Sequence, residues 1–588
     1  MRKKSAVYLT ILLFSVFAHA QSEAGAIWLL ISPSASMNGM GGVGVCLPDT
    51  DPVSAYFNPA NGMLAYRGIS IASSYMETDW LQNMASDIEL SHSYLGLNLL
   101  PSKFAFQLAI NNQNTVLDLG TAAVVDTNVS GVDELKSAMT SNANSLSFRY
   151  WGNVKGIPFD ISIGFTRKEV IQRLGEYKSE NIFYDYGVLT ALPFKFSPDE
   201  DWYVSISPAF GYSLSNIGDS IVVKNPDYAD PTPRTVRTGI SLSSKITLAD
   251  GWNLFEYRGA RAADDILLKS TEPIRYQSGL GDIAFFQNIL LSKKDSALTI
   301  SRGHEISFLD IYTFRFGRMI KISSKINEYS TGYGIKSVGI FCLLAHLSGI
   351  EEFSLINNFL TIEYNYAKWT EEVGHPRDDT EFSAYTFSIN NIDQIVHRII
   401  SHKSGTPELS SGDLTISAGM NFSSMLFSSK DTRQVANMKS GTGVDFGIEK
   451  KMKFLITGLS FTQYAAQYKF EIPTDLFYFN PRITERYNYL TLYGLLPVAL
   501  IGPLSAIGGV QIASCMSVDL TAQDRLDCFP CQQKALNYGL LGGFDFAFGP
   551  RIIMRTSYNY WLKNLKSLVY SEDHFKLNGI RLNLLFNL

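Results

Sequence analysis

Residues 204–214 read VSISPAFGYSL, and their side chains alternate strictly between two kinds. One kind is apolar and consists of Val204, Ile206, Pro208, Phe210 and Tyr212. The other kind is small, with Ser, Ala and Gly at the intervening positions. Because successive side chains of a strand point to opposite faces, the stretch predicts a β-strand with one apolar and one small, polar face. A strand of about 10 residues is long enough to cross the hydrocarbon core of a bilayer.

The same alternation recurs at the far end of the chain. Phe544, Phe546 and Phe548 oppose Asp545 and Ala547. A last strand sets Ile580, Leu582, Leu584, Phe586 and Leu588 against Arg581, Asn583 and Asn587. A soluble β-sandwich would also alternate, but the strand length, the small polar face and the aromatic residues near strand ends favour a membrane protein. The sequence therefore predicts an all-β fold of transmembrane antiparallel β-barrels, which are closed because unpaired backbone groups cannot face lipid.

Candidate strands fall into two groups, which predicts two barrels in tandem. The first group, in residues 68–390, has about fourteen strands, an even number as expected of a bacterial barrel. Its clearest members are 68–77, 91–100, 103–111, 144–153, 157–168, 181–193, 201–214, 234–247, 301–308, 311–319, 333–343, 358–368 and 380–389, with one or two more within 253–292. The second group, in residues 412–588, has eight strands near 414–427, 441–451, 454–470, 486–500, 505–520, 536–549, 551–565 and 575–588.

Connections in the second group alternate between short turns, as at 502–503, and longer loops at 428–440, 471–485, 521–535 and 566–574. This asymmetry is typical of short periplasmic turns and long outer loops. One stretch, Tyr487–Val518, has no charged residue and could be taken for a helical span. Pro497 and Gly502-Pro503 interrupt it, so we interpret it as two strands joined by a tight turn.

Residues 391–411 form a predicted linker with a different period. Ile392, Ile395, Val396, Ile399 and Ile400 fall at helical spacing, and Gly405 and Pro407 follow as a stop signal. An even-stranded barrel begins and ends on one side, so we expect a short amphipathic helix on the periplasmic side. Its apolar stripe is interpreted as packing against a barrel mouth or the inner leaflet rather than as a partner-binding surface.

The first 20 residues predict a secretory signal peptide. Arg2, Lys3 and Lys4 precede an apolar run over 6–17, and Ala18-His19-Ala20 is a cleavage motif before Gln21. Removing three positive charges takes the formal net charge from −5 to −8, which excludes a strongly basic nucleic-acid binder. Export, a charged content of 18% and an aromatic content of 13% together point to a membrane. For transmembrane β-barrels we expect the outer membrane of a Gram-negative bacterium, with its lipid as one partner.

Glycines 39, 41 and 44 match the letters of a dinucleotide-binding fingerprint. That motif needs a preceding strand and a following helix, whereas Cys46-Leu47-Pro48 follows at once in an exported chain. We therefore predict no nucleotide and no other cofactor. Gly39, Gly41, Gly42 and Gly44 are interpreted instead as positions that permit close backbone packing inside a barrel lumen.

Three segments near the N-terminus carry a specific resemblance: 25–35 (GAIWLLISPSA), 40–45 (MGGVGV) and 55–60 (AYFNPA). With the later segments 303–308, 314–317, 331–335 and 363–367, they resemble the PorV/PorQ family, in the wider group similar to the FadL long-chain fatty-acid transporters. The resemblance covers about residues 23–390. It implies a fourteen-stranded outer-membrane barrel with residues 21–67 as an N-terminal plug, and a role in the type IX protein secretion of Bacteroidetes-type bacteria.

Asn58-Pro59-Ala60 lies in the last of these segments. Pro59 fixes a turn and Asn58 can bond to nearby backbone, which fits a structured lumenal plug; a simple turn before the first strand is the alternative. The second barrel resembles the eight-stranded PorT-like family in segments 416–423, 489–493 and 539–544. Side chains about fill the interior of eight strands, so we expect this barrel to act in recognition rather than as a channel.

Five cysteines remain: Cys46, Cys342, Cys515, Cys528 and Cys531. Cys528 and Cys531 share one predicted outer loop, where a local disulfide is favoured over free thiols because the compartment is oxidising. A zinc site would need further ligands, which this loop lacks, so no metal is predicted. His residues are scattered and Ser residues lack a nucleophile-elbow frame, so we expect no catalytic residues and no enzyme activity.

These observations lead to a functional expectation. The chain is expected to be a non-enzymatic component or accessory of type IX secretion that contacts cargo proteins or other envelope proteins. Stretches 112–143 and 215–233, interpreted as long loops, could supply the recognition surface. The alternatives are transport of a hydrophobic small molecule through the larger barrel, as the FadL-type resemblance allows, and a purely structural outer-membrane protein.

Overall fold

The computed structural model describes residues 24–48, 51–62, 68–81, 88–101, 104–125, 132–175, 177–223, 229–269, 275–322, 326–350, 353, 356, 358–371, 375–394, 414–427, 435–452, 455–470, 472–473, 478–479, 482–501, 503–522, 525–530, 537–549, 551–562, 565–566 and 574–587. The predicted signal peptide lies outside these residues. The chain divides into two compact units, Met1–Asp393 and Gln394–Leu588.

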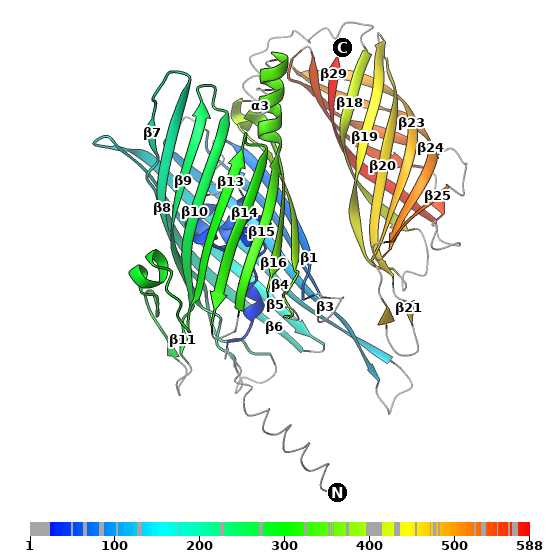
Figure 1. Ribbon diagram of the computed structural model, residues 1–588. Helices are drawn as coiled ribbons and strands as arrows, with labels where there is room; N and C mark the ends of the chain where they lie inside the picture. The colour runs from blue at the N-terminus through cyan, green and yellow to red at the C-terminus, as the bar shows by residue number, and fades with distance from the viewer. Residues whose placement is uncertain are drawn as a thin grey trace. The chain divides into compact units, whose positions relative to one another are not determined.

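The first unit contains a closed barrel of fourteen antiparallel strands among the described residues (Figure 1). They are β1 Ser70–Asp79, β2 Glu89–Asn98, β3 Phe106–Val125, β4 Val132–Val154, β5 Ile157–Leu174, β6 Tyr177–Ala191, β8 Trp202–Gly218, β9 Thr235–Leu248, β10 Asn253–Ile266, β13 Thr299–Phe308, β14 Tyr312–Lys321, β15 Ile326–Lys336, β16 Leu360–Thr370 and β17 Glu381–Ile389. Consecutive strands pair, β1 pairs with β17 and closes the ring, and the short β7 Phe194–Phe196 pairs beside β8.

The two faces of this wall have the polarity of a membrane barrel. Outward positions carry large apolar side chains that stay exposed, such as Phe210, Phe314 and Phe316. Inward positions carry buried charges, such as Glu305 and Arg315. A soluble barrel would reverse this arrangement, whereas a barrel in lipid needs its apolar side chains outside. The structure confirms the predicted all-β fold of closed transmembrane barrels, with fourteen and eight strands.

The barrel has two distinct ends. At one, which we name the turn end, the chain enters β1 and leaves β17, and tight connections join β4 to β5 and β13 to β14. At the other, the loop end, β3 and β4 continue as a hairpin of 20 and 23 residues. Since short turns face the periplasm in such barrels, the loop end corresponds to the cell exterior.

Several predicted strand boundaries are wrong. The strand predicted at 333–343 is β15 up to Lys336, followed by helix α3 Ser337–Ser348. Alternation stops after Lys336, where a nearly continuous apolar run begins, and Gly339 of the helix packs directly on the backbone of Leu309. Within 253–292 only β10 joins the barrel; the short hairpin of β11 Leu268–Lys269 with β12 Arg275–Tyr276 and the π-helix η6 Phe285–Leu290 make up the rest.

The stretch 112–143 is not a loop, because β3 and β4 pair through most of it. Their alternation continues beyond the membrane-length segment, with Asn and Ser in place of large apolar residues. The stretch 215–233 likewise begins inside β8, and its Ile221 forms a β-bridge with Asp230. Both stretches are therefore paired structure over part of their length.

The second unit contains the closed eight-stranded barrel. Its strands are β18 Leu414–Phe427, β19 Val435–Met452, β20 Leu455–Phe470, β23 Arg482–Ile501, β24 Leu504–Ala522, β26 Asn537–Ala547, β27 Ile552–Trp561 and β29 His574–Asn587, and β18 pairs with β29. The uncharged stretch Tyr487–Val518 forms β23 and β24, joined by the predicted tight turn. Short extra strands accompany the ring: β21 Ile472–Pro473, β22 Tyr478–Phe479, β25 Arg525–Pro530 and β28 Leu565–Lys566.

Helices are few and short. Among the described residues, no helix is long and apolar enough to span a membrane. Of the amphipathic helix predicted in the linker, Ile392, Asp393 and Gln394 are helical, and the remainder lies outside the described residues.

Candidate functional site

Residues 24–62 lie inside the larger barrel and form its plug. The plug consists of short helical turns: η1 Ile27–Leu30, α2 Ala35–Gly39, η2 Gly44–Cys46, η3 Pro52–Tyr56 and η4 Pro59–Asn61. Each turn packs on a different part of the wall: α2 on β14 to β17, η2 on β8 to β10, η3 on β1 and β2, and η4 on β4 to β6. The plug therefore contacts the wall on all sides of the lumen.

The plug runs along the barrel from one end to the other. At the loop end, the Gly25 amide donates a hydrogen bond to the Pro231 carbonyl (2.9 Å). Leu47 and Pro48 reach the turn end, and the chain enters β1 there at Ser70. The N-terminal end of the described chain is thus at the loop end of its own barrel.

Close backbone approach at the plug glycines explains the Gly-rich sequence. Gly41 has φ +69°, and a Cβ there would lie 2.7 Å from the Arg318 backbone nitrogen on β14. A Cβ on Gly44 would lie 2.4 Å from the Phe57 ring. Gly39 lies beside Arg315, and Gly42 has φ +81°. A larger residue at Gly41 would therefore push the plug off the wall, and one at Gly44 would separate two parts of the plug.

Asn58-Pro59-Ala60 fastens the plug to the opposite wall. Asn58 accepts a hydrogen bond from the Ala60 amide and donates from Nδ2 to Val45 O (2.9 Å) and Val188 O (3.0 Å). The hydroxyls of Ser147 and Ser162 donate to Pro59 O and Ala60 O, both at 2.8 Å. The segment is therefore bonded to both the plug and the strands β4, β5 and β6.

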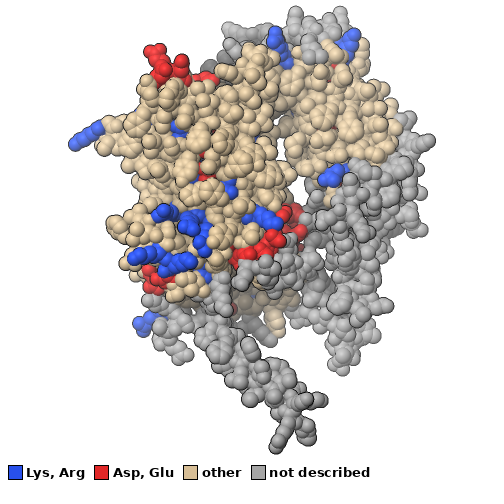
Figure 2. Space-filling model, in the orientation of Figure 1, with Lys and Arg blue, Asp and Glu red and all other residues tan. Residues whose placement is uncertain are grey.

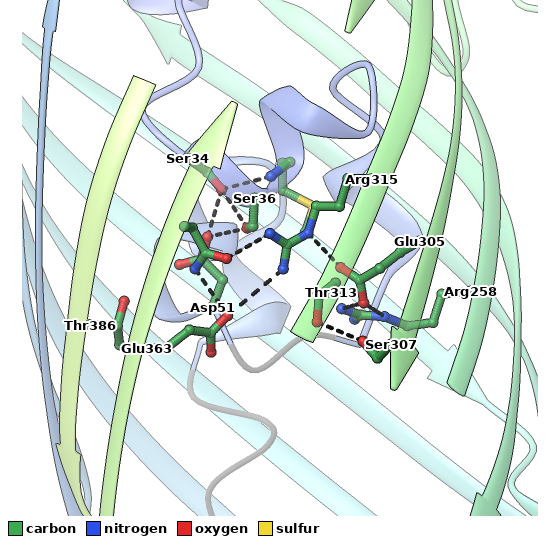
Figure 3. A network of polar contacts seen from close by, with 12 residues as sticks. Ser34, Ser36, Asp51, Arg258, Glu305, Ser307, Thr313, Arg315, Glu363 and Thr386 are labelled. Atoms are coloured by element: carbon green, nitrogen blue, oxygen red, sulfur yellow. Dashed lines mark hydrogen bonds and ion pairs between the residues drawn. The ribbon is translucent and has the colours of Figure 1, made fainter. Parts of the chain in front are cut away.

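A second polar cluster holds the plug's own turns together (Figure 3). The buried Asp51 carboxylate accepts hydrogen bonds from the hydroxyls of Ser34 (2.6 Å) and Ser36, and from the Val53 amide (3.0 Å). These contacts join α2 to η3 across an intervening stretch of chain. Asp51 thus acts as an internal clasp of the plug.

Beside this clasp, a row of buried charged side chains runs across the inner face of several wall strands (Figure 3). Glu305 on β13 accepts from Arg258 Nε (2.7 Å) on β10 and from Arg315 Nε (2.6 Å) on β14. Arg315 also donates from Nη1 to Asn365 Oδ1 (2.6 Å), and its Nη2 lies 3.8 Å from Glu363 Oε1. Since each of these charges has an opposite partner, the network offers no unpaired charge for binding.

The main cavity of the first unit lies at the loop end, between plug and wall. This loop-end cavity has a volume of about 460 Å³. Its apolar lining combines aliphatic side chains with five aromatic rings, namely Trp28, Tyr56, Phe57, Trp80 and Trp369. Trp80 and Trp369 meet edge to face with their centroids 5.8 Å apart. The cavity is large enough, and apolar enough, for a small organic molecule.

Charged groups line the same cavity at fixed positions. Arg237 Nε lies 3.3 Å from Asp264 Oδ2, Arg377 pairs with Glu328 and stacks 4.4 Å over the Trp369 ring, and Lys321 adds a third cation. Four buried lining atoms have no hydrogen-bond partner among the described residues: Trp28 Nε1, Asn38 Oδ1, Glu328 Oε1 and Arg377 Nε. The cavity thus combines aromatic walls, three cations against two carboxylates, and unused donors and acceptors.

A second cavity of about 400 Å³ lies at the turn end of the same barrel. Its lining is polar and includes the ion pairs Arg149–Asp160 and Lys245–Glu256, together with Lys336. Leu47 and Pro48 form the boundary of this cavity on the side of the plug. The plug therefore leaves open space toward both ends of the barrel.

Side chains occupy the interior of the eight-stranded barrel. Arg555 donates to Asp545 Oδ1 (2.7 Å) and Glu449 Oε2 (2.6 Å), and Arg581 donates to the Tyr464 hydroxyl (2.5 Å). Tyr464, Tyr489 and Trp561 pack their rings together beside this layer. This packing agrees with the size of an eight-stranded barrel, whose interior is about filled by side chains.

The cysteines fall into different environments. Cys46, on η2, is fully buried and its Sγ lies 3.7 Å from Val43 O; burial raises the pKa of this thiol to about 12. Cys515 on β24 is disulfide-bonded, a bond that the sequence analysis did not predict. The side chains of Cys528 and Cys531 lie outside the described residues, so a disulfide between them stays a prediction. No group of three metal-ligating side chains occurs in the part of the chain that the structure describes.

Sequence reasoning missed the residues of the loop-end cavity. Trp80, Arg237, Glu328, Trp369 and Arg377 were not singled out, although alternation places Arg237 and Glu328 on the inward face of β9 and β15. The sequence signal that could have identified these two residues is a charged side chain on the small-residue face of a predicted membrane strand. Alternation does not contain the strand pairing that brings these residues, which are far apart in the sequence, to one pocket.

The fold and site together define a transmembrane β-barrel protein of the outer-membrane type, with a plugged larger barrel and a filled smaller one. No family model and no curated protein matches the sequence. Among solved structures, Neisserial surface protein A aligns with 30% of this chain and 97% of its own at 10% identity and a TM-score of 0.22. Ail of Yersinia pestis aligns with 30% and 100% at 13% identity and 0.19. A mutant of the ferric enterobactin receptor of Pseudomonas aeruginosa aligns with 89% and 82% at 9% identity and 0.25.

Proposed function

We propose that this chain is a non-enzymatic protein of the Gram-negative outer membrane, exported by a cleaved signal peptide, that acts in type IX secretion by binding a cargo or envelope protein. The observation that carries the proposal is the plug. Residues 25–60, which carry the PorV/PorQ resemblance, are fastened to the wall on all sides by short polar contacts. A barrel sealed in this way is suited to recognition at its ends rather than to passage of a protein through its lumen.

The loop end supplies a surface for such recognition. The β3–β4 hairpin continues well past membrane length, and a strand that leaves the membrane offers backbone and side chains to an exported protein. The smaller barrel, with its PorT-like resemblance, has a filled interior and is proposed to contribute a further contact surface through its loops or turns. A purely structural role is the outcome if neither surface binds a partner.

The test is the secreted and surface proteome of a deletion strain of the native organism, complemented with variants. Deletion is expected to deplete a class of exported proteins and to leave their precursors in the periplasm. A variant with the β3–β4 hairpin shortened by equal numbers of residues from both strands is expected to reproduce this loss. An unchanged secretome in the deletion strain would refute the proposal.

A second candidate function is favoured by the loop-end cavity. Its aromatic walls suit a hydrophobic body, and Arg237, Lys321 and Arg377 suit an anionic group at one end. The corresponding activity is transport of an amphipathic small molecule across the outer membrane. It is tested by uptake of radiolabelled long-chain carboxylates into cells that carry the wild-type chain or the Trp369→Ala variant; equal uptake with and without the protein would refute it.

A further inference from the structure

Three arginines form a row on the outer surface of the larger barrel. Arg261 on β10 is the direct cross-strand partner of Arg302 on β13, which in turn is the direct partner of Arg318 on β14. All three alternate with inward residues such as Glu305 and therefore face outward. Neighbouring strands lie about 4.8 Å apart, so the three guanidinium groups can converge on one small anion.

The row lies near the loop-end ends of its strands. On β14 the outward residues from the turn end are Tyr312, Phe314, Phe316, Arg318 and Ile320, and the strand ends at Lys321. On β13 they are Phe308, Ile306, His304 and then Arg302. On β13 and β14 the arginines thus lie one outward residue before the loop-end end of the strand, in the region where acyl chains give way to headgroups.

Described carboxylates do not neutralise this row. Arg261 donates to the Leu290 carbonyl, and Arg318 donates from Nε (3.0 Å) and Nη2 (2.6 Å) to Asn327 Oδ1 while lying 4.6 Å over the Tyr329 ring. These acceptors are uncharged. Among the described residues, no acceptor is bonded to the Arg302 guanidinium, which is exposed.

Such an arrangement is unfavourable unless an anion binds it. Like charges directly opposite each other in a sheet destabilise it, and an arginine on the lipid-facing surface costs free energy that falls toward the interface. Phosphate oxygens are the natural counter-ion, because guanidinium groups bind them with strong, charge-assisted hydrogen bonds.

The adjoining loop supports a lipid as the source of that phosphate. The π-helix η6 packs on the outer wall through Phe285, next to Phe210, and leaves Phe286 (72%) and Leu291 (64%) exposed. Lys293 and Lys294 follow directly. Figure 2 shows basic side chains gathered over the lower part of this wall, which is the loop-end part. Exposed apolar side chains beside lysines fit a membrane interface, where the former enter the acyl layer and the latter meet headgroups.

We propose that Arg261, Arg302 and Arg318 bind the phosphate group of an anionic glycolipid in the outer leaflet, with the η6 loop covering its acyl chains. The site lies on the outside of the barrel wall. It is therefore separate from the loop-end cavity and independent of the proposed role in secretion.

The test is titration of the purified full-length chain, in a neutral detergent, with diphosphoryl lipid A, with the bound fraction read by native mass spectrometry. Each Arg→Gln change is expected to weaken binding about fivefold, equivalent to about 1 kcal/mol per basic residue at an anionic surface, and the triple variant about a hundredfold. The matched control is Arg167→Gln, an exposed arginine paired with Glu169 on β5, which should change binding less than twofold.

Two further arms make the result decisive. Inorganic phosphate at millimolar concentration should not displace lipid A; displacement would mean that the row takes a free anion and would overturn the lipid proposal. Equal binding by wild type and Arg302→Gln would also overturn it. This single variant breaks no described hydrogen bond, so it is expected to fold, and its heat-modifiable mobility on gels verifies this.

Discussion

Gly211, an inward residue of the stretch 204–214, provides a direct test of how the plug is held. A Cβ at this position would lie 2.0 Å from the Val45 carbonyl oxygen and 2.7 Å from Cys46 Cα on η2. Ordinary contacts begin at 3.4 Å, so Gly211→Ala requires a movement of 3.4 − 2.0 = 1.4 Å. Because β8 is fixed by ladders on both sides, we expect η2 to move away from the wall rather than the strand to yield.

The native thiol of Cys46 reports that movement. In the wild type, burial raises its pKa to about 12, so at pH 8 only about one molecule in ten thousand carries a reactive thiolate. Once η2 lifts and water reaches the sulfur, the pKa returns to about 8.5 and the thiolate fraction to about a quarter. Maleimide labelling of Cys46 should therefore accelerate by up to about three orders of magnitude in Gly211→Ala.

The assay is peptide mass spectrometry of the folded chain after timed labelling in detergent. Ser213→Ala is the matched control, two residues along the same inward face; it removes a hydrogen bond to Ser215 and adds no atom. Labelling of Gly211→Ala at the wild-type rate, with the barrel still folded, would refute the reasoning. Equal acceleration in the control would show general loosening of β8 instead of a displaced plug.

Three further predictions concern the interior and the cysteines. Arg315→Met removes the donor that Glu305 and Asn365 share and should destabilise the folded chain by about 3–5 kcal/mol in urea unfolding, and an unchanged midpoint would contradict the network. Trp369→Ala removes a wall of the loop-end cavity and should weaken binding of a long-chain alkyl sulfate at least tenfold by intrinsic fluorescence; unchanged affinity would exclude the cavity as its site. Cys515 is disulfide-bonded and Cys46 and Cys342 are free, so non-reducing peptide mapping is expected to link Cys515 to Cys528 or Cys531, whereas a Cys528–Cys531 peptide would restore the loop disulfide.

The fold class could be predicted from the sequence because every strand that contacts lipid must by itself show an apolar outward face. Phe544 and Asp545 are neighbours, and a period of two sends one to lipid and the other to the lumen. This reasoning needs no tertiary information, and it located the strands of the smaller barrel closely. The predicted boundary failed at Lys336, where β15 ends and α3 begins. An apolar run such as 337–348 fits a strand or a helix until its tertiary neighbours are known.

The candidate site was less accessible to sequence reasoning. Trp28 comes from the plug, Trp80 follows β1, and Trp369 lies near the end of β16. Their meeting depends on the closure of the ring and on the path of the plug. Neither is a local property, so single residues of the cavity could not be ranked before the structure placed them together.

The strand register determines which residues of an alternating pattern face the lumen and which face the lipid. Arg315 and Arg318 are three residues apart on β14, so alternation requires one to face the lumen and the other to face outward, without deciding which. The pairing decides it: Arg315 lies opposite Glu305, and Arg318 lies opposite Arg302. A slip of one residue would send Phe314 and Phe316 into the polar lumen and Arg315 into the acyl layer. Lipid outside and ion pairs inside therefore select the same register, and only that register collects three arginines at the headgroup border.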